Sequence, residues 1–200
     1  MLDLLGFGFS DQPSDFGYHV HDHAQQLVRF IEAQEWKQID LYGHSMGGSV
    51  AIEAANLIGN VRHLILSEAN LDSGGGEFSR PIAAAQEADY ISGGHLRTID
   101  AAKAAGDADW AATMRVSSAR AVYRGAKSLV DGGTPAWRSR FLSHPAQKAF
   151  VFGERSLPDP DQEILASQGI MVFVVPDAGH SMSLENPHGL AEALAKASSD

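Results

Sequence analysis

A serine between two glycines, at the junction of a strand and a helix, constrains this chain more than any other feature. Residues 38–43 are typical of a strand, and residues 46–58 are predicted to form a helix. Ser45 stands at the corner between them, in the pattern Gly43-His44-Ser45-Met46-Gly47. Such a turn projects the serine hydroxyl out of the sheet. We therefore predict that Ser45 is a nucleophile. We also predict that the N–H of Met46, at the start of the helix, stabilises negative charge on a substrate oxygen.

Three glycines around Ser45 are expected to make this turn sterically feasible. A bulky side chain two positions away, at residue 43 or residue 47, is expected to clash within the turn. Gly48 is expected to let the helix approach the sheet. A short G-x-S-x-G pattern also occurs by chance, but its position between a strand and a helix favours the functional interpretation.

The candidate base is a histidine near the end of the chain. A serine hydroxyl is a weak nucleophile until a base takes its proton, and the pKa of histidine suits that role. The chain has nine histidines. His180 follows the last predicted strand, on a loop at the same sheet edge as Ser45. His44 adjoins the nucleophile and is expected to pack inside the turn, although it is also a candidate for the substrate pocket.

Segments typical of strands and helices alternate on both sides of a helical block at residues 72–148. This alternation is typical of a parallel α/β sheet with an insertion, and the block is long enough to form a lid. The expected strands are residues 1–6, 38–43, 61–69, 148–153 and 170–176, and the expected flanking helices are residues 20–34, 46–58 and 187–197.

Three segments, LDLLGFGFSDQP, YGHSMGG and VVPDAGHSMSLENP, resemble the α/β-hydrolase superfamily in their order and spacing. The resemblance covers nearly the whole chain. It implies an α/β fold with a mostly parallel, doubly wound sheet, and a triad of serine, acid and histidine in that order. It also implies a core formed by residues 1–71 and 149–200, with a helical cap at residues 72–148. Trp110 and Trp137 in the cap are candidates for the substrate pocket, although each could equally belong to the cap's own core.

The acid of the triad is not where most of this superfamily has it. Most members have an aspartate three residues after the glycine that ends the strand at residues 148–153, and this chain has Ser156 there. The alternatives are Glu68, at the end of the preceding strand, and Asp159 or Asp161, in a longer loop. Haloalkane dehalogenases of the superfamily have a glutamate at nearly the same spacing as Glu68. A carboxylate at that position would be partly buried, which is unfavourable unless it is paired, so we favour Glu68.

The N-terminal part departs furthest from the superfamily. The resemblance implies several further strands before residues 1–6, and a His-Gly loop that supplies a second oxyanion donor. We therefore expect an N-terminally truncated fold, in which Leu5, Gly6 or Phe7 would have to replace that donor. Loss of one donor typically lowers kcat about 10²–10³-fold. The missing strands would expose an edge of the sheet, so a homodimer is possible. The alternative function is that of a weakened or non-catalytic binding protein.

Composition excludes several function classes. The net charge of −10 argues against nucleic acid and anionic membranes as partners, because both attract basic surfaces. Cysteine is absent, which excludes disulfides and thiolate chemistry. The first residues lack the basic segment of a signal peptide, and no apolar run approaches ~20 residues. We therefore expect a cytoplasmic protein.

The segment His19-Val-His-Asp-His23 suggests a metal cluster but opens a predicted helix. Asp22 suits the first turn of that helix, and the spacing is one residue short of the binuclear H-x-H-x-D-H pattern. We expect neither a metal nor a cofactor. The predicted function is hydrolysis of small, fairly apolar carboxylic esters, with a small-molecule substrate and an acyl-enzyme intermediate.

Overall fold

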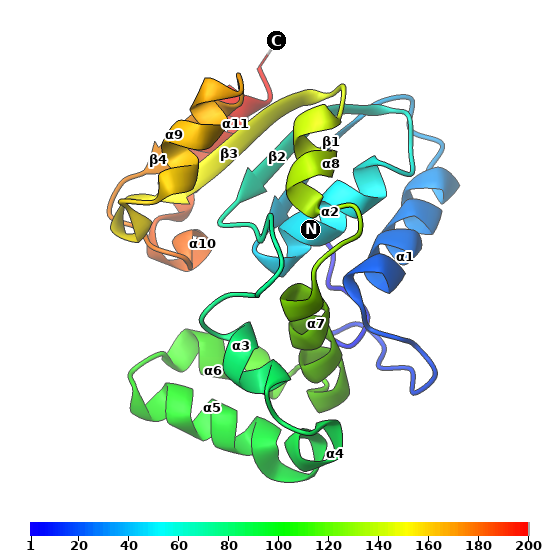
Figure 1. The fold of residues 1–200 in the computed structure, drawn as a ribbon, viewed down its shortest axis with the longest axis vertical. Helices are drawn as coiled ribbons and strands as arrows, with labels where there is room; N and C mark the ends of the chain where they lie inside the picture. Colours follow the sequence, from blue (N-terminus) through cyan, green and yellow to red (C-terminus); the bar gives the residue numbers. More distant parts are fainter. Residues whose placement is uncertain (200) are drawn as a thin grey trace. The chain divides into compact units, whose positions relative to one another are not determined.

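The computed structural model describes residues 1–199 (Figure 1). The chain divides into two compact units, one formed by residues 1–26 and 72–134 and the other by residues 27–71 and 135–200. The second unit contains the sheet, and its parallel α/β architecture confirms the predicted fold class. No helix within residues 1–199 is long and apolar enough to cross a bilayer.

The sheet has four parallel strands in the order β1-β2-β3-β4. These strands are β1 (Ile39–His44), β2 (Val61–Ser67), β3 (Gln147–Gly153) and β4 (Met171–Val175). The last five residues of each central strand are buried, because helices cover both faces of the sheet there. The carboxyl ends of all four strands lie at one edge, where His44 is opposite Ser67 and Gly153 is opposite Val175.

Helices cover both faces of this sheet, as a doubly wound fold requires. On one face, Ile65 and Val151 pack with Leu190 and Ala193 of α11 (Pro187–Ala197) in a buried apolar cluster. Figure 1 shows α8 and α9 in front of the sheet and α11 behind it. The other helices of this unit are α2 (Met46–Ala55), α8 (Trp137–Ser143), α9 (Pro160–Ser167), the short α10 (Met182–Glu185) and the 3₁₀ turn η2 (Glu154–Ser156).

The first unit contains a bundle of helices around its own apolar core. Ile82, Tyr90, Ile99 and Val122 are among the residues buried in that core. The elements of the helical block are α3 (Ser79–Ala83), α4 (Glu87–Asp89), the π-helical turn η1 (Tyr90–Gly94), α5 (His95–Ala104), α6 (Ala108–Arg115) and α7 (Ala119–Asp131). Within the described residues the block contains no strand, as predicted. The boundary with the second unit falls inside α1 (Val20–Ala33).

The limits of the compact units differ from the predicted core and cap in two places. Residues 1–26 group with the helical block rather than with the sheet. Residues 135–148 group with the sheet, because α8 packs on α2 and the following residues enter β3. Residues 72–134 are the part of the predicted cap segment that belongs to the first unit, and the cap role itself stays a prediction.

The strand predicted at residues 1–6 is not formed. The backbone there turns, with the N–H of Gly6 donating to Asp11 and the N–H of Phe7 donating to Leu4, at 2.8 and 2.9 Å. The Asp3 carboxylate accepts from the N–H of Phe9 at 3.0 Å. These polar groups are satisfied within the segment, so they do not join a sheet ladder. The carbonyl of Gly6 accepts from the N–H of Ser118, at the start of α7, at 2.7 Å.

Candidate active site

Ser45 occupies a strained turn between β1 and α2. Its φ of 51° lies in the left-handed region, which side chains other than glycine rarely adopt, and its ψ is −124°. The N–H of Ser45 donates to the carbonyl of Ser67 at 2.9 Å, and the N–H of Gly48 donates back to the carbonyl of Ser45 at 2.9 Å. A conformation of this kind costs of order 1–3 kcal/mol and persists where surrounding contacts impose it. The turn therefore has the geometry that the G-x-S-x-G context predicted.

Two of the three glycines around Ser45 are required by close contacts. A Cβ at Gly43 would lie 2.4 Å from the carbonyl oxygen of Gly47, and a Cβ at Gly48 would lie 2.4 Å from the Cβ of Ala69. A Cβ at Gly47 would meet no atom within 4 Å. The expectation of a clash was therefore wrong for Gly47, because its Cβ direction leads into open space.

His180 reaches Ser45 from the loop that follows β4. Its Nε2 lies 3.1 Å from the Oγ of Ser45, within hydrogen-bond distance. The loop is held on its backbone: Glu185 accepts from the N–H of Gly179 at 2.7 Å, and Glu154 accepts from the N–H of Asp177 at 2.9 Å. These carboxylates fix the backbone on both sides of Ala178, so the position of His180 does not depend on its own side-chain contacts alone.

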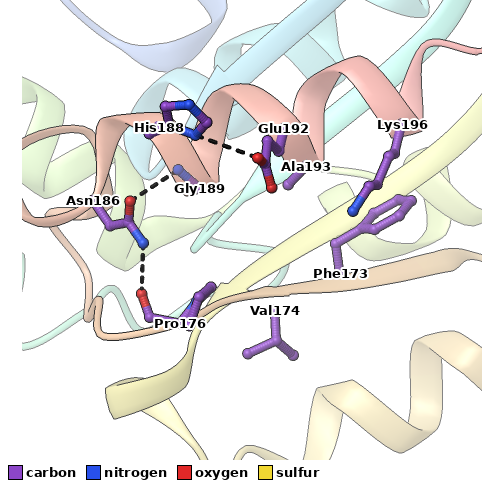
Figure 2. Close-up of a pocket in the computed structure, with 9 residues that line it drawn as sticks. All are labelled: Phe173, Val174, Pro176, Asn186, His188, Gly189, Glu192, Ala193 and Lys196. Carbon is purple, nitrogen blue, oxygen red and sulfur yellow. Dashed lines mark hydrogen bonds and ion pairs between the residues drawn. The ribbon is translucent and has the colours of Figure 1, made fainter.

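The start of the His180 loop is tied to α11 through Asn186. Figure 2 shows the Asn186 side chain between two backbone groups. Its Nδ2 donates to the carbonyl of Pro176 at 2.9 Å, and its oxygen accepts from the N–H of Gly189 at 2.9 Å, which caps the helix. These residues border an open groove of about 520 Å³ along β4 and α11, which contains none of the predicted catalytic residues.

Glu68 lies on the other side of the His180 ring. Its Oε2 is 3.7 Å from Nδ1 of His180, and its Oε1 accepts from the N–H of Gly153 at 2.8 Å. Glu68 also has a positive φ of 46°, which turns the chain sharply after β2. Burial opposes ionisation of this carboxyl. The nearby His180 side chain, together with hydrogen bonds from Gly153 and Ser156, outweighs that effect and holds the pKa of Glu68 below its ordinary value.

The alternative acids have other partners. Asp159 is the N-cap of α9, where its side chain accepts from the N–H of Asp161 at 2.8 Å. Asp161 forms a two-point ion pair with Arg138, with both N···O distances at 2.9 Å. Of the three candidates, Glu68 is the one that the structure brings to His180. Ser156, at the position where the superfamily usually has its aspartate, supports the Glu68 carboxylate instead.

His44 contributes a contact that the sequence reasoning did not foresee. Its ring packs against the His180 ring, with centroids 4.9 Å apart and planes inclined at 53°. Its Nδ1 lies 3.0 Å from the Oγ of Ser67, and that hydroxyl lies 2.7 Å from the hydroxyl of Tyr42. The strand alternation could have revealed this chain of contacts, because Tyr42 and His44 are two residues apart and share one face of β1.

The two predicted pocket tryptophans lie in different units. Trp137 is 1% exposed, in α8 of the sheet unit, and its Nε1 donates to Glu53 at 2.8 Å. It is therefore a core residue of that unit rather than a pocket residue. Trp110 lies in α6 of the helical unit and stacks on Phe78, with ring centroids 4.8 Å apart.

The N–H of Met46 is at the first position of α2, where backbone N–H groups have no partner within the helix. The sequence predicted this group as the oxyanion donor, and that role stays a prediction. The other three candidate donors are in the first unit, and two of them, Gly6 and Phe7, already donate their N–H groups within the N-terminal turns.

The histidines of residues 19–23 do not converge. His23 is buried among aromatic rings, whereas Nε2 of His21 lies 2.9 Å from the side-chain amide of Gln25 and His19 is exposed. No group of three or more His, Cys, Asp or Glu side chains within residues 1–199 could hold a metal ion.

Comparison with proteins of known sequence shows partial matches to several hydrolases. A 2-hydroxymuconate semialdehyde hydrolase from Pseudomonas sp. (strain CF600) is 40% identical over 53 residues, which are 26% of this chain and 19% of that protein. Haloalkane dehalogenase 2 from Mycobacterium tuberculosis (strain ATCC 25618 / H37Rv) is 35% identical over 63 residues, which are 30% of this chain and 22% of that protein. The matched segments thus span about a fifth of the length of these curated relatives.

Solved structures share the fold over nearly the whole chain. An esterase from Exiguobacterium antarcticum has a TM-score of 0.78 at 19% identity, and the match covers 97% of this chain and 78% of that one. A thermophilic esterase from Thermogutta terrifontis has a TM-score of 0.71 at 19% identity, over 97% of this chain and 76% of that one. A sequence model of the alpha/beta hydrolase family matches residues 1–193. Strand order, nucleophile turn and family match agree, and the chain belongs to the alpha/beta hydrolase family.

Proposed function

We propose that this protein is a serine hydrolase that cleaves small, fairly apolar carboxylic esters through an acyl-enzyme intermediate. The observation that carries the proposal is the 3.1 Å contact between Nε2 of His180 and Oγ of Ser45, with the Glu68 carboxylate facing the other ring nitrogen. This is the arrangement in which a base can take the serine proton while an acid stabilises the resulting imidazolium. The esterases among the similar structures agree with an ester substrate.

The reaction would proceed in two stages around Ser45. In the first, Oγ attacks the ester carbonyl carbon while Nε2 of His180 takes the hydroxyl proton, and the N–H of Met46 donates to the carbonyl oxygen as it becomes negative. The C–O bond to the alcohol then breaks, and His180 returns the proton to the leaving oxygen. In the second stage, water attacks the acyl-serine, His180 takes its proton, and the carboxylic acid leaves as Oγ is reprotonated.

The serine at this position argues against displacement of a halide, despite the partial match to a haloalkane dehalogenase. That chemistry uses a carboxylate nucleophile in the superfamily, whereas the turn here presents the hydroxyl of Ser45. An acyl-serine ester forms from a carbonyl substrate. Thioesters, lactones, amides and activated C–C bonds are therefore the other substrate classes to compare with esters.

The test combines turnover of p-nitrophenyl acetate and butyrate with covalent labelling by a fluorophosphonate probe. The unchanged protein is compared with Ser45→Ala and with Ser49→Ala. The second variant is a matched control, because the Ser49 hydroxyl is buried in α2 and donates to the carbonyl of Asn70. We expect labelling and turnover to vanish in Ser45→Ala and to persist in Ser49→Ala. Absence of both signals in the folded, unchanged protein would favour a non-catalytic binding protein.

A further inference from the structure

Two side chains contact the His180 ring from different directions, Glu68 through its carboxylate and His44 through its ring. The 3.7 Å separation between Nδ1 and Oε2 exceeds the 2.7–3.2 Å range of N–H···O hydrogen bonds. The His180 side chain is also 42% exposed, so the protein surrounds it incompletely. Glu68 can stabilise positive charge on the ring at this distance.

The His44 ring is the second of these contacts. It lies against the His180 ring at 4.9 Å between centroids, a distance within the range of packed aromatic pairs. Both the backbone and the side chain of His44 are held in place. Its backbone belongs to β1 in parallel register opposite Ser67, and its Nδ1 lies 3.0 Å from the Ser67 hydroxyl. Tyr42 holds that hydroxyl from the other side at 2.7 Å.

Ser67, whose hydroxyl contacts His44, also contacts the backbone of Ser45. Its carbonyl accepts from the N–H of Ser45 at 2.9 Å, and the next residue along the chain is Glu68. One short segment at the end of β2 therefore contacts the nucleophile, presents the acid and fixes the ring that packs on the base.

We propose that His44, anchored through Ser67 to Tyr42, is a positioning residue that holds the His180 imidazole in line with Ser45. The inference rests on the proposed function, since it assigns a role within the same site. His44 acts through His180 and has no bond-making role of its own.

The electrostatics of His44 agree with this role. Burial, and then the nearby His180, lower the pKa of His44 to about 4. The groups that face it are His180, Glu68 and the hydroxyl of Ser67, which in turn contacts the hydroxyl of Tyr42. At neutral pH the ring is therefore uncharged. It can pack on His180 without repelling the imidazolium that forms during the reaction.

The experiment measures the second-order rate of fluorophosphonate labelling, together with kcat and KM for p-nitrophenyl acetate. The variants are His44→Ala, which removes the ring, and Ser67→Ala, which removes only its anchor. Ser49→Ala again serves as the matched control for loss of a buried hydroxyl. We expect both test variants to lose roughly 10- to 100-fold in labelling rate and kcat with little change in KM, because small misplacements of a catalytic group have effects of this size. A rise in KM at unchanged kcat would instead make His44 a substrate contact and overturn the proposal.

A second readout does not depend on activity. Nitrogen-15 NMR of the His180 ring should show one set of narrow signals in the unchanged protein, and broadened or doubled signals in Ser67→Ala. If the unchanged protein neither labels nor turns over, the proposed function fails, and the ring signals still decide whether His44 holds His180. Wild-type labelling rates and wild-type ring signals in both variants would overturn the positioning role.

Discussion

The Glu68 carboxylate contacts two structural neighbours at once, with one oxygen 3.7 Å from Nδ1 of His180 and the other 2.8 Å from the backbone nitrogen of Gly153. Glu68 follows β2 and Gly153 ends β3, whereas His180 follows β4. The acid therefore bridges the ends of three parallel strands. This bridge places a glutamate that follows an early strand beside a histidine that follows the last one.

Replacing Glu68 by glutamine should lower kcat by roughly 10²–10⁴-fold, because the amide cannot stabilise the imidazolium as a carboxylate does. Asp161→Asn is the matched control, since that carboxylate pairs with Arg138. It should leave kcat within about threefold and lower stability by no more than about 1 kcal/mol. Ester turnover and chemical unfolding of both variants measure these effects. An unchanged kcat in Glu68→Gln would mean that another residue is the acid of the triad.

Gly153→Ala should displace the His180 loop. The added Cβ would lie 2.4 Å from the carbonyl oxygen of Gly179 and 2.6 Å from that of Ala178, so the backbone must move. We expect a loss of roughly 10- to 100-fold in labelling rate. Gly59→Ala is the control, because a Cβ there meets no atom within 4 Å. Equal labelling rates in the two variants would show that the loop adapts without moving His180.

Alanine substitution at two glycines of the nucleophile turn should change the stability of the fold by different amounts. Gly43→Ala places a Cβ against the Gly47 carbonyl and should destabilise the fold by about 1–3 kcal/mol. Gly47→Ala meets open space within α2, and it should be neutral or stabilising by up to about 1 kcal/mol. Urea unfolding of the two variants provides the comparison. A similar loss of stability in both would contradict the contact geometry.

His23 should make the stability of the chain sensitive to mild acid. It is 1% exposed and lies among the rings of Phe7, Phe16 and Tyr18, and burial lowers its pKa from 6.5 to about 4. Between these two pH values the unfolded state binds more protons, so the stability present above pH 6.5 declines as the pH falls towards 4. The contribution of His23 to this decline is at most about 3 kcal/mol.

The check is the free energy of unfolding measured between pH 7.5 and pH 4.5. His23→Phe keeps an aromatic ring in the cluster but cannot be protonated, so it should flatten part of the pH dependence. His44, whose pKa is also about 4, contributes in the same direction and retains its share. An identical slope in the variant and the unchanged protein would mean that the pKa of His23 is not lowered in the folded state.

Local sequence pattern was sufficient for most of the secondary structure. Apolar periodicity located α1 and α11 to within a residue, and the runs that became β2 and β3 were recognised as buried strands. The failure at residues 1–6 has a physical reason. A strand forms only where its backbone groups pair with a neighbouring strand. The N–H groups of Gly6 and Phe7 donate within their own turns instead.

The sequence by itself determined the family, the nucleophile turn, and the identities of Ser45 and His180 as candidates, because these depend on residue types at short spacing. Only the tertiary structure showed that Glu68, rather than Asp159 or Asp161, lies beside His180, because that depends on which strand ends lie side by side. It also placed Trp137 in the core and brought His44 against His180. Contacts of this kind join residues that are distant along the chain, and the packing of the parallel strands determines which of them meet.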